Sequence, residues 1–244
     1  MKSSRLINEI RHGEVIASKG EEVWHWSSPA GKVRFKRRSR MLKKFIGNKN
    51  KKVLELGCGT GIFTKEIAKT KNKIFAIDIS STLLRLAQKR VKAGNVKFIL
   101  GNAYQTKFND NYFDYIVGNS ILHYLDIDLA IKEIYRLLKD GGGFIFTEPN
   151  MLNPQVALER KVPLMRKIAN NSQDETAFIR WSIRKKLLKA GFYKLKIRPF
   201  DFLHPFTPAS LIKTVNIMGK WLEKTPLVKE IGGSLVISGQ KESD

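Results

Sequence analysis

The chain has a single cysteine, Cys58, among its 244 residues. One thiol cannot form an internal disulfide or a multi-thiolate zinc site, so the sequence favours a reducing compartment, and we expect a cytoplasmic protein. The four histidines show no metal-ligand spacing, and we predict no bound metal. Long apolar runs are also lacking. The longest charge-free stretches, such as Tyr115 to Leu125, are eleven residues, against the roughly 18 to 20 that a membrane-spanning helix needs. We therefore expect no transmembrane span, and the charged first fourteen residues predict no export signal.

Acidic residues are few relative to basic ones, which gives a formal net charge of +23. Residues 1–52 hold 15 basic and 4 acidic residues (+11), residues 53–150 hold 13 and 10 (+3), and residues 151–244 hold 17 and 8 (+9). A net charge of this size attracts polyanions such as RNA, anionic lipid headgroups or phosphorylated metabolites. A solvated, lysine-rich surface without a polyanionic partner is an equal alternative. The densest cluster, Lys32 to Lys44, predicts a helix with Phe35, Leu42 and Ile46 inward and its basic side outward.

From Val53 onward, short β-rich runs alternate with helical patterns, which is typical of βαβ units and a parallel sheet. Helical periodicity follows Ser80 as far as Gly94, spans Ile127 to Leu138, and recurs in Glu175 to Ala190. We predict one α/β domain: a Rossmann-like, doubly wound, seven-stranded, mostly parallel sheet with helices on both faces. The predicted strands are Val53–Leu56, Lys73–Ile77, Val96–Leu100, Tyr112–Val117, Gly143–Thr147, Phe192–Arg198 and Ser234–Gly239.

Three segments lie outside this alternation. Residues 1–52 are expected to form a basic N-terminal lid or arm packed on the core domain, 53–244, with Trp24 and Trp26 either closing over a ligand or anchoring the core. Insertions at about 150–174 and 199–231 follow strand ends, where ligands of α/β sheets bind, so we expect them to form the substrate pocket. Covers over the sheet are the alternative, and the stripe Leu211, Val215, Met218, Leu222 favours core packing.

The most informative segment is Val53 to Thr64, in which a strand ends in glycines at alternate positions, Gly57, Gly59 and Gly61, before a helix. Glycine permits a positive φ and a close approach of ligand to backbone. The spacing differs from the Gly-x-Gly-x-x-Gly fingerprint, and the Gly-x-x-x-x-Gly-Lys phosphate loop is absent, which disfavours NAD and ATP. Asp78 ends the second strand, where a carboxylate can accept both hydroxyls of a ribose. Together these features indicate an adenosine-like ligand.

In these residues the sequence resembles the class I S-adenosylmethionine-dependent methyltransferases, closest to the small-molecule enzymes of ubiquinone and menaquinone biosynthesis. The resemblance covers about Val53 to Glu148 and includes Phe113 to Val117 and Leu137 to Gly142. It implies S-adenosylmethionine as cofactor and S-adenosylhomocysteine as product. The family more often has Asp where Asn102 stands, and an amide oxygen there can still accept from adenine. The implied cofactor-binding residues are Glu55, Gly57, Cys58, Gly59, Thr60, Gly61, Asp78, Ile79, Asn102, Ala103 and Asn119.

Candidate catalytic residues lie beyond the strand ends. His123 is the first candidate for a general base, because imidazole titrates near neutral pH and the family lines its cleft with this loop, although simple packing is as good an explanation. Glu148 after the fifth strand and His204 in the aromatic insertion are the others. Tyr124 is adjacent to His123.

We expect in-line methyl transfer to a small or lipid-like organic acceptor. The Pro-Pro-aromatic motif of exocyclic base-amine enzymes is missing, and Cys58 in the glycine loop is unsuited as a cytosine-C5 nucleophile. The alternatives are an RNA methyltransferase that uses the basic N-terminal arm and a non-catalytic S-adenosylmethionine-binding module. The acceptor atom and the oligomeric state stay open.

Overall fold

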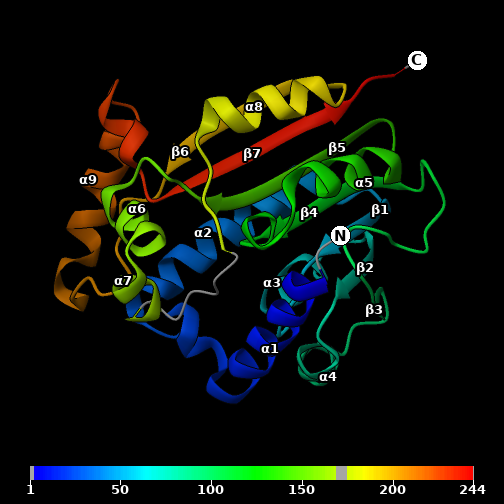
Figure 1. Ribbon diagram of the computed structural model, residues 1–244, viewed down its shortest axis with the longest axis horizontal. Coiled ribbons are helices and arrows are strands. Elements are labelled where there is room, and N and C mark those ends of the chain that lie inside the picture. Colours follow the sequence, from blue (N-terminus) through cyan, green and yellow to red (C-terminus); the bar gives the residue numbers. More distant parts are fainter. Residues whose placement is uncertain (1–2, 169–174, 244) are drawn as a thin grey trace.

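The computed structural model describes residues 3–168 and 175–243. In this described part the centre is a seven-stranded sheet of order β3-β2-β1-β4-β5-β7-β6 (Figure 1). Strands β1 to β5 pair in parallel, whereas β7 is antiparallel to both β5 and β6. The predicted fold class is confirmed, and only β5, which begins before Gly143, departs from its predicted bounds by more than two residues. The strands are β1 (Lys52–Leu56), β2 (Lys73–Asp78), β3 (Val96–Leu100), β4 (Phe113–Asn119), β5 (Leu138–Pro149), β6 (Phe192–Phe200) and β7 (Ser234–Lys241).

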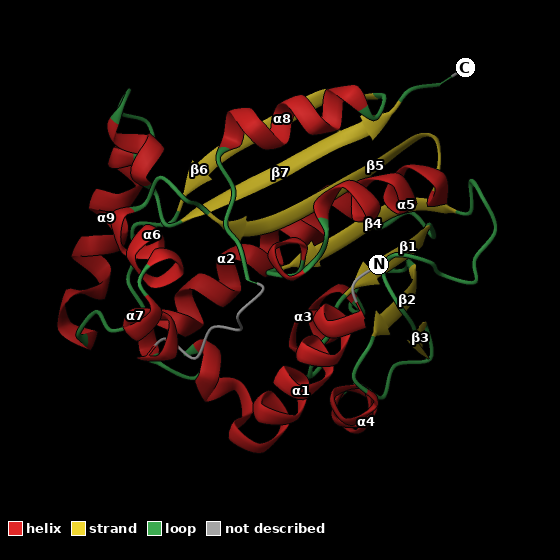
Figure 2. Cartoon of the chain, viewed as in Figure 1, coloured by secondary structure: helices red, strands yellow, loops and turns green. Residues whose placement is uncertain are grey.

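Helices cover both faces of the sheet (Figure 2). The helices α2 (Pro29–Ile46), α3 (Ile62–Ile67) and α4 (Ser81–Arg90) pack on one face, and α5 (Ile127–Leu137) and α8 (Arg180–Lys189) pack on the other. Alternate strand residues point to opposite faces, so Val53 packs with Leu42 of α2 while Leu54 joins Ile134 of α5. The near-continuous apolar run of β1 therefore reflects burial on both sides.

Side-chain caps explain where α4 and α5 begin, and backbone pairing explains why α8 begins later than predicted. Ser80 accepts a hydrogen bond from Leu83 N, and Asp126 accepts from the first turn of α5. The predicted helix from Glu175 begins instead at Arg180, because Thr176 and Phe178 pair with other backbone: Thr176 N donates to His123 O, and Phe178 bridges to Asn150. The α4 helix ends at Arg90, short of the predicted stop at Gly94.

The N-terminal helix α1 (Ser3–Lys19) packs against α4, and the short helix η1 (Gly20–Trp24) follows it (Figure 1). The approach is close, since a Cβ added at Gly13 would lie 2.8 Å from Ser80 Cβ. Glycine at this position therefore lets α1 lie directly on the start of α4.

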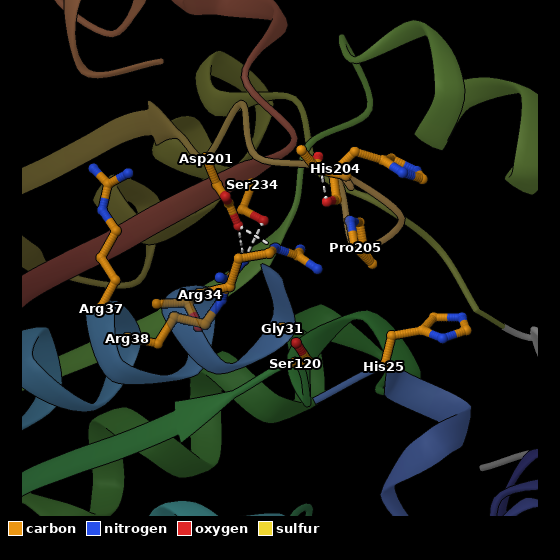
Figure 3. A network of polar contacts seen from close by, with 12 residues as sticks. His25, Gly31, Arg34, Arg37, Arg38, Ser120, Asp201, His204, Pro205 and Ser234 are labelled. Atoms are coloured by element: carbon orange, nitrogen blue, oxygen red, sulfur yellow. Dashed lines mark hydrogen bonds and ion pairs between the residues drawn. The ribbon is translucent and has the colours of Figure 1, made fainter. Parts of the chain in front are cut away.

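The basic helix α2 is only partly exposed in the way predicted. Lys36 and Arg40 are exposed, but Arg38 is buried and faces the segment after β6, with Arg34 and Arg37 beside it (Figure 3). The prediction of a basic outer side thus holds for the lysines and not for these arginines. Their acidic partners, far away in the sequence, could not be read from the helix itself.

The two predicted insertions lie at one end of the sheet (Figure 1). Residues 169–174 of the first lie outside the described residues. Leu211 and Met218 are exposed, so the prediction that they pack in the core is wrong: α9 contacts the body through Gly219, which lies against Phe202. No helix of the described chain is long and apolar enough to cross a membrane. The elements are α6 (Pro154–Lys161), α7 (Pro163–Ile168), η3 (Ala209–Leu211), α9 (Ile212–Leu222) and η4 (Val228–Ile231).

Candidate functional site

The glycine loop between β1 and α3 has the left-handed backbone that its sequence predicts. Gly57, Gly59 and Gly61 have φ of 64°, 53° and 79°, values that side chains disfavour. A Cβ at Gly57 would lie 2.5 Å from Ile121 Cδ1, and one at Gly61 would lie 2.9 Å from Ala87 Cβ. A Cβ at Gly59 would meet only Trp24, at 3.6 Å. Gly57 and Gly61 are therefore required by packing, whereas Gly59 leaves its backbone accessible from the cavity.

A cavity with about 1100 Å³ of empty space, including its open mouth, lies over this loop. This size is in the range of small-molecule sites. Its floor comes from the carboxyl ends of β1, β2 and β4 and the loop after β3, where ligands of α/β folds bind. Its opposite wall comes from α1 and η1. The floor residues include Gly57, Cys58, Gly59, Thr60, Asp78, Ile79, Asn102, Ala103, Tyr104, Asn119 and Ile121; the opposite wall includes Arg5, Leu6, Glu9, His12, Ile16, Trp24 and Trp26.

Asp78 is held in place by backbone amides. Its Oδ2 accepts from Gly59 N at 2.8 Å and its Oδ1 from Ser80 N at 2.9 Å. Burial raises the pKa of this carboxyl, although the amide hydrogen bonds favour the charged form and act in the opposite direction. Each carboxylate oxygen keeps a second lone pair, so Asp78 can still accept hydrogen bonds from a ligand in the cavity.

Two other titratable groups near the loop are kept neutral by burial. Burial, with the charge of Asp78 adding to it, raises the pKa of Glu55 to about 8, and this side chain lies behind the loop rather than in the cavity lining. Burial and the neighbouring carboxyls also raise the pKa of the Cys58 thiol. Cys58 lines the cavity as an inert thiol, which agrees with excluding it as a nucleophile.

The remaining predicted cofactor residues differ in how they are held. Asn102 Oδ1 accepts from Tyr104 N at 2.9 Å, and Thr60 Oγ1 accepts from Arg90 Nη1 at 2.9 Å. Asn119 accepts from the Thr147 hydroxyl. Gly61 faces α4 and is absent from the cavity lining, unlike Thr60, Ile79, Asn102, Ala103 and Asn119, which belong to it.

His123 and Glu148 point away from the cavity. Glu148 Oε1 accepts from the backbone amides of Ile121 and Leu122 at 3.0 and 2.9 Å, and its Oε2 lies 2.7 Å from His123 Nδ1. Both side chains are buried, and neither lines the cavity. We expected a general base and a second catalytic group at the acceptor, and the structure places neither side chain there. The pair instead supports the loop from Asn119 to Ile121, which does line the cavity.

His204 is also remote from the cavity. Its Nδ1 accepts from Phe206 N at 3.2 Å, and its ring lies against Phe206 near α2. Figure 3 shows it beside Pro205, beyond the arginines of α2. Burial lowers its pKa, and Arg34 lowers it further. It does not contact the cavity that holds the other candidates, so the structure gives it no place at an acceptor.

The structure instead places His12 in the wall of the cavity. Its Nε2 lies 3.8 Å from Glu175 Oε1, and Glu175 Oε2 lies 2.7 Å from Arg160 Nη1. Its ring centre lies 5.7 Å from that of Tyr124, another lining residue. Burial lowers the pKa of His12, and the charge of Glu175 partly offsets this. The imidazole is therefore neutral at neutral pH and able to accept a proton.

Sequence reasoning missed His12 because it lies outside the sheet. A usable signal was present: Arg5, Glu9, His12 and Ile16 recur at helical spacing and share one face of α1. Glu175 and Arg160 lie in separate segments, so nothing in the sequence indicated their contact. Among the described residues, no cluster of His, Cys, Asp and Glu could hold a metal ion.

Solved structures share this architecture along nearly the whole chain. The methyltransferase in a complex with the Trm112 methyltransferase activator from Haloferax volcanii aligns over 97% of this chain and 98% of its own, with a TM-score of 0.68 and 19% identity. The N-methyltransferase NodS from Bradyrhizobium japonicum, solved with S-adenosylhomocysteine, aligns over 96% and 98%, with a TM-score of 0.65 and 16% identity. At these identities, the likeness shows the fold.

Sequence comparison gives the chemistry. Residues 54–146 match the family model described as "Methyltransferase domain". The demethylmenaquinone methyltransferase of Geobacillus stearothermophilus is 28% identical over 190 residues, which cover 68% of this chain and 80% of that protein. That of Staphylococcus aureus is 28% identical over 184 residues, covering 67% and 76%. These matches support a class I S-adenosylmethionine-dependent methyltransferase. S-adenosylmethionine, the cofactor that the resemblance implied, is thus confirmed.

The family match covers the part of the methyltransferase that the resemblance covered, from β1 into β5. The α1 wall of the cavity and the C-terminal insertions lie outside it. The cofactor half of the site therefore lies within the family match, and the half that faces α1 lies outside it.

Proposed function

We propose that this methyltransferase transfers a methyl group to a small, ring-bearing or lipid-like organic acceptor that binds between α1 and the cofactor. The observation that carries the proposal is the composition of the α1 side of the cavity. Leu6, Ile16, Trp24 and Trp26 are apolar or aromatic, and Arg5, Glu9 and His12 are the polar residues among them. Mostly apolar walls with a few convergent polar groups are typical of sites for small organic ligands. The names of the demethylmenaquinone methyltransferases support an acceptor of this kind.

The cofactor half of the site fits S-adenosylmethionine. The open backbone at Gly59 and the carboxylate of Asp78, fixed by two amides, offer the close approach and the acceptors that an amino-acid chain and a ribose need. Ile79, Asn102 and Ala103 would border the adenine. The bound cofactor supplies an activated methyl group, and the protein accelerates its transfer chiefly by positioning the acceptor.

We further propose that His12 accepts the proton of the acceptor. It is the one described imidazole in the cavity lining, it is neutral at neutral pH, and Glu175 beside it would stabilise the imidazolium. Arg160 holds Glu175 in turn. His123, which we expected in this role, would orient the loop through Glu148 instead.

The N-terminal residues 1–52 would act as the lid. Arg5 Nε donates to Tyr124 O at 2.8 Å, which ties the start of α1 to the loop after β4. Gly13 allows close packing on Ser80 at the other side of the cavity. A wall fixed at both sides excludes water from a reaction in which hydrolysis or proton loss would compete.

Methylation of RNA is supported less well by this geometry. Arg34, Arg37 and Arg38, the arginines of the N-terminal basic cluster that could clamp phosphates, face acidic side chains of the C-terminal insertion. Helix α1 also lies over the cavity opposite the glycine loop, which leaves less room for an RNA strand to reach the cofactor. A non-catalytic binding module would not need a histidine backed by a carboxylate in the wall of the cavity.

The test is turnover of a panel of quinone-type and phenolic compounds that includes demethylmenaquinone, followed with S-adenosylmethionine labelled in its methyl group. His12→Gln should lower turnover on the order of a hundredfold, the usual contribution of a general base. S-adenosylhomocysteine affinity should not change. Because the folded-state pKa of His12 lies below 6.5, the wild-type rate should fall as the pH drops through that lowered pKa, and His12→Gln should lose this dependence.

The matched control is His25→Gln, since His25 packs on Phe206 outside the cavity. Equal turnover of wild type and His12→Gln would remove His12 from the mechanism. Turnover of RNA substrates but of no compound in the panel would replace the proposed acceptor class.

A further inference from the structure

We propose that the surface of α9 and its flanking turns binds the headgroup region of an anionic lipid bilayer. This docking face consists of Phe206, Leu211, Met218, Trp221 and Leu227, with Lys213, Lys220 and Lys224 beside them. Nothing in this inference depends on which acceptor is methylated. The face lies at the outer edge of the molecule, away from the helices α5 and α8 (Figure 1).

The apolar side chains of the docking face are unusually exposed. Leu227 is 84% exposed, Trp221 72% and Phe206 68%, the three highest values among the exposed large hydrophobic residues of the described chain. Leu227 also has a φ of 65°, a strained conformation for a leucine that places its side chain at the tip of a turn. Scattered single apolar residues are normal on surfaces, but a concentration of this kind marks an interaction site.

Helical spacing gathers three of the apolar residues into one stripe. Leu211, Met218 and Trp221 lie at i, i+7 and i+10, and so they share one side of η3 and α9. Lys213, Lys220 and Lys224 lie at i, i+7 and i+11 and form a second exposed stripe. The two stripes meet where Lys224 follows Trp221 by one helical turn. Opposite them, Gly219 contacts Phe202 and anchors the helix to the body.

The acidic side chains of this insertion point inward. Asp201 lies 2.6 Å from Arg38 and 2.9 Å from Arg34, Glu223 Oε1 lies 2.6 Å from Arg37, and Glu230 lies 2.9 Å from Arg180. These are all the acidic residues between 199 and 231. The insertion therefore presents its lysines outward while its carboxylates are neutralised inside, which makes the exposed charge of the docking face positive.

This pattern fits a bilayer better than a protein partner or a second copy. Lysines are depleted in protein interfaces, whereas here exposed lysines occupy the same helix as the apolar stripe. A helix that presents Trp and Leu together with lysines lies in the interface between headgroups and acyl chains, where anionic lipids attract the ammonium groups. The net charge of +23 adds long-range attraction to such a surface.

The docking face is held rigidly to the catalytic fold. Arg37 binds Glu223 at the end of α9. Arg38 donates to Ser234 Oγ at 2.8 Å while pairing with Asp201 (Figure 3). Both arginines belong to α2, whose Arg34 and Arg38 also lie over the ring of Trp26 in the cavity wall. A bilayer bound at the docking face would thus keep a fixed distance and orientation relative to the cavity.

The test is co-sedimentation of the full chain with vesicles of phosphatidylcholine alone and of phosphatidylcholine with about 30 mol% phosphatidylglycerol, at about 0.1 M salt. The wild type should bind the anionic vesicles far more tightly. Lys213→Gln, Lys220→Gln and Lys224→Gln together should weaken binding on the order of a hundredfold, at about fivefold per lysine. The matched control neutralises three lysines exposed elsewhere, Lys89, Lys97 and Lys107, and should retain most of the binding.

A second pair of variants tests the apolar stripe. Trp221→Ala with Leu227→Ala should weaken binding at least tenfold, because each side chain loses apolar contact with the acyl boundary. The control is Trp181→Ala with Leu188→Ala, which removes a tryptophan and a leucine of similar kind, 53% and 51% exposed, from α8. Circular dichroism of each variant confirms that it is folded.

Three results would overturn the proposal. The first is no sedimentation with anionic vesicles. The second is equal loss of binding in the docking-face variants and in their matched controls, which would reduce the effect to net charge. The third is a purified dimer that dissociates in Trp221→Ala with Leu227→Ala, because the face would then belong to a second copy of the chain.

Discussion

Replacing Arg38 by Met tests the buried junction between α2 and the C-terminal insertion. Arg38 and Asp201 are both 3% exposed in their side chains and lie 2.6 Å apart. Removing one partner of a buried pair usually costs about 3 to 5 kcal/mol, because the other charge stays buried. Arg34 still lies 2.9 Å from Asp201, which favours the lower end. We therefore expect a loss of about 3 kcal/mol, or a fall in Tm of about 6 to 12 °C for a chain of this size.

The pH dependence of stability provides a second readout of the same junction. Burial opposes ionisation of Asp201, but Arg38 and Arg34 outweigh it and lower its pKa from 3.8 to about 2. Burial lowers the pKa of Arg38 to about 10, which leaves it charged at neutral pH. The contribution of Asp201, about 2.4 kcal/mol from that shift, is present above its unfolded-state pKa and is lost as the pH falls from about 4 towards 2.

The assay is urea unfolding followed by circular dichroism at pH 7 and at several values down to the acid transition. Arg38→Met should lower the free energy of unfolding at pH 7 and flatten its acid dependence. The control, Arg40→Met, changes an exposed arginine of the same helix and should stay within about 0.5 kcal/mol of the wild type. If Arg38→Met matched that control, the buried pair would not be stabilising this junction.

Three further predictions concern the cavity. Gly57→Ala places a Cβ 2.5 Å from Ile121 Cδ1 at a φ of 64°; it should cost about 2 to 4 kcal/mol in urea unfolding, and adding Ile121→Ala should recover part of that loss. Burial raises the pKa of Glu55 to about 8, so the wild type should lose stability as the pH rises from about 4.5 to 8, and Glu55→Gln should lack this loss. Urea midpoints of wild type and variant that change in parallel between pH 5 and pH 8 would contradict this. Gly13→Val should push α1 from Ser80 and increase proteolysis within the first nineteen residues, measured by mass spectrometry.

The sheet and the cofactor half of the site were predictable because they depend on local patterns. Strand lengths follow from apolar runs buried on two faces, and Gly57 and Asp78 end consecutive strands at the same edge. The start of β5 was predicted less well. Leu138 already pairs with Phe113 of β4, but regular pairing resumes only at Gly143, after an irregularity that contains Gly141 at a φ of 70°.

The acceptor half could not be predicted because it depends on contacts between distant segments. His12 meets Glu175 across 163 residues of sequence, taken as the difference of their numbers. Arg38 is buried against Asp201, which lies far away in the sequence, and no local pattern in α2 indicates that contact. His123 lies beyond the end of β4, as expected, whereas Glu148 lies within β5 instead of after it. The amides of Ile121 and Leu122 take up its carboxylate.

The most direct test of the account is transfer of labelled methyl from S-adenosylmethionine into a fractionated cell extract by the wild type and by Asp78→Ala. The variant should bind S-adenosylhomocysteine between about fivefold and 150-fold more weakly, as expected from lost charged hydrogen bonds. The account predicts label in the solvent-extractable, small-molecule fraction, strongly reduced with Asp78→Ala at limiting cofactor. Label in nuclease-sensitive material, or equal labelling by both proteins, would contradict it.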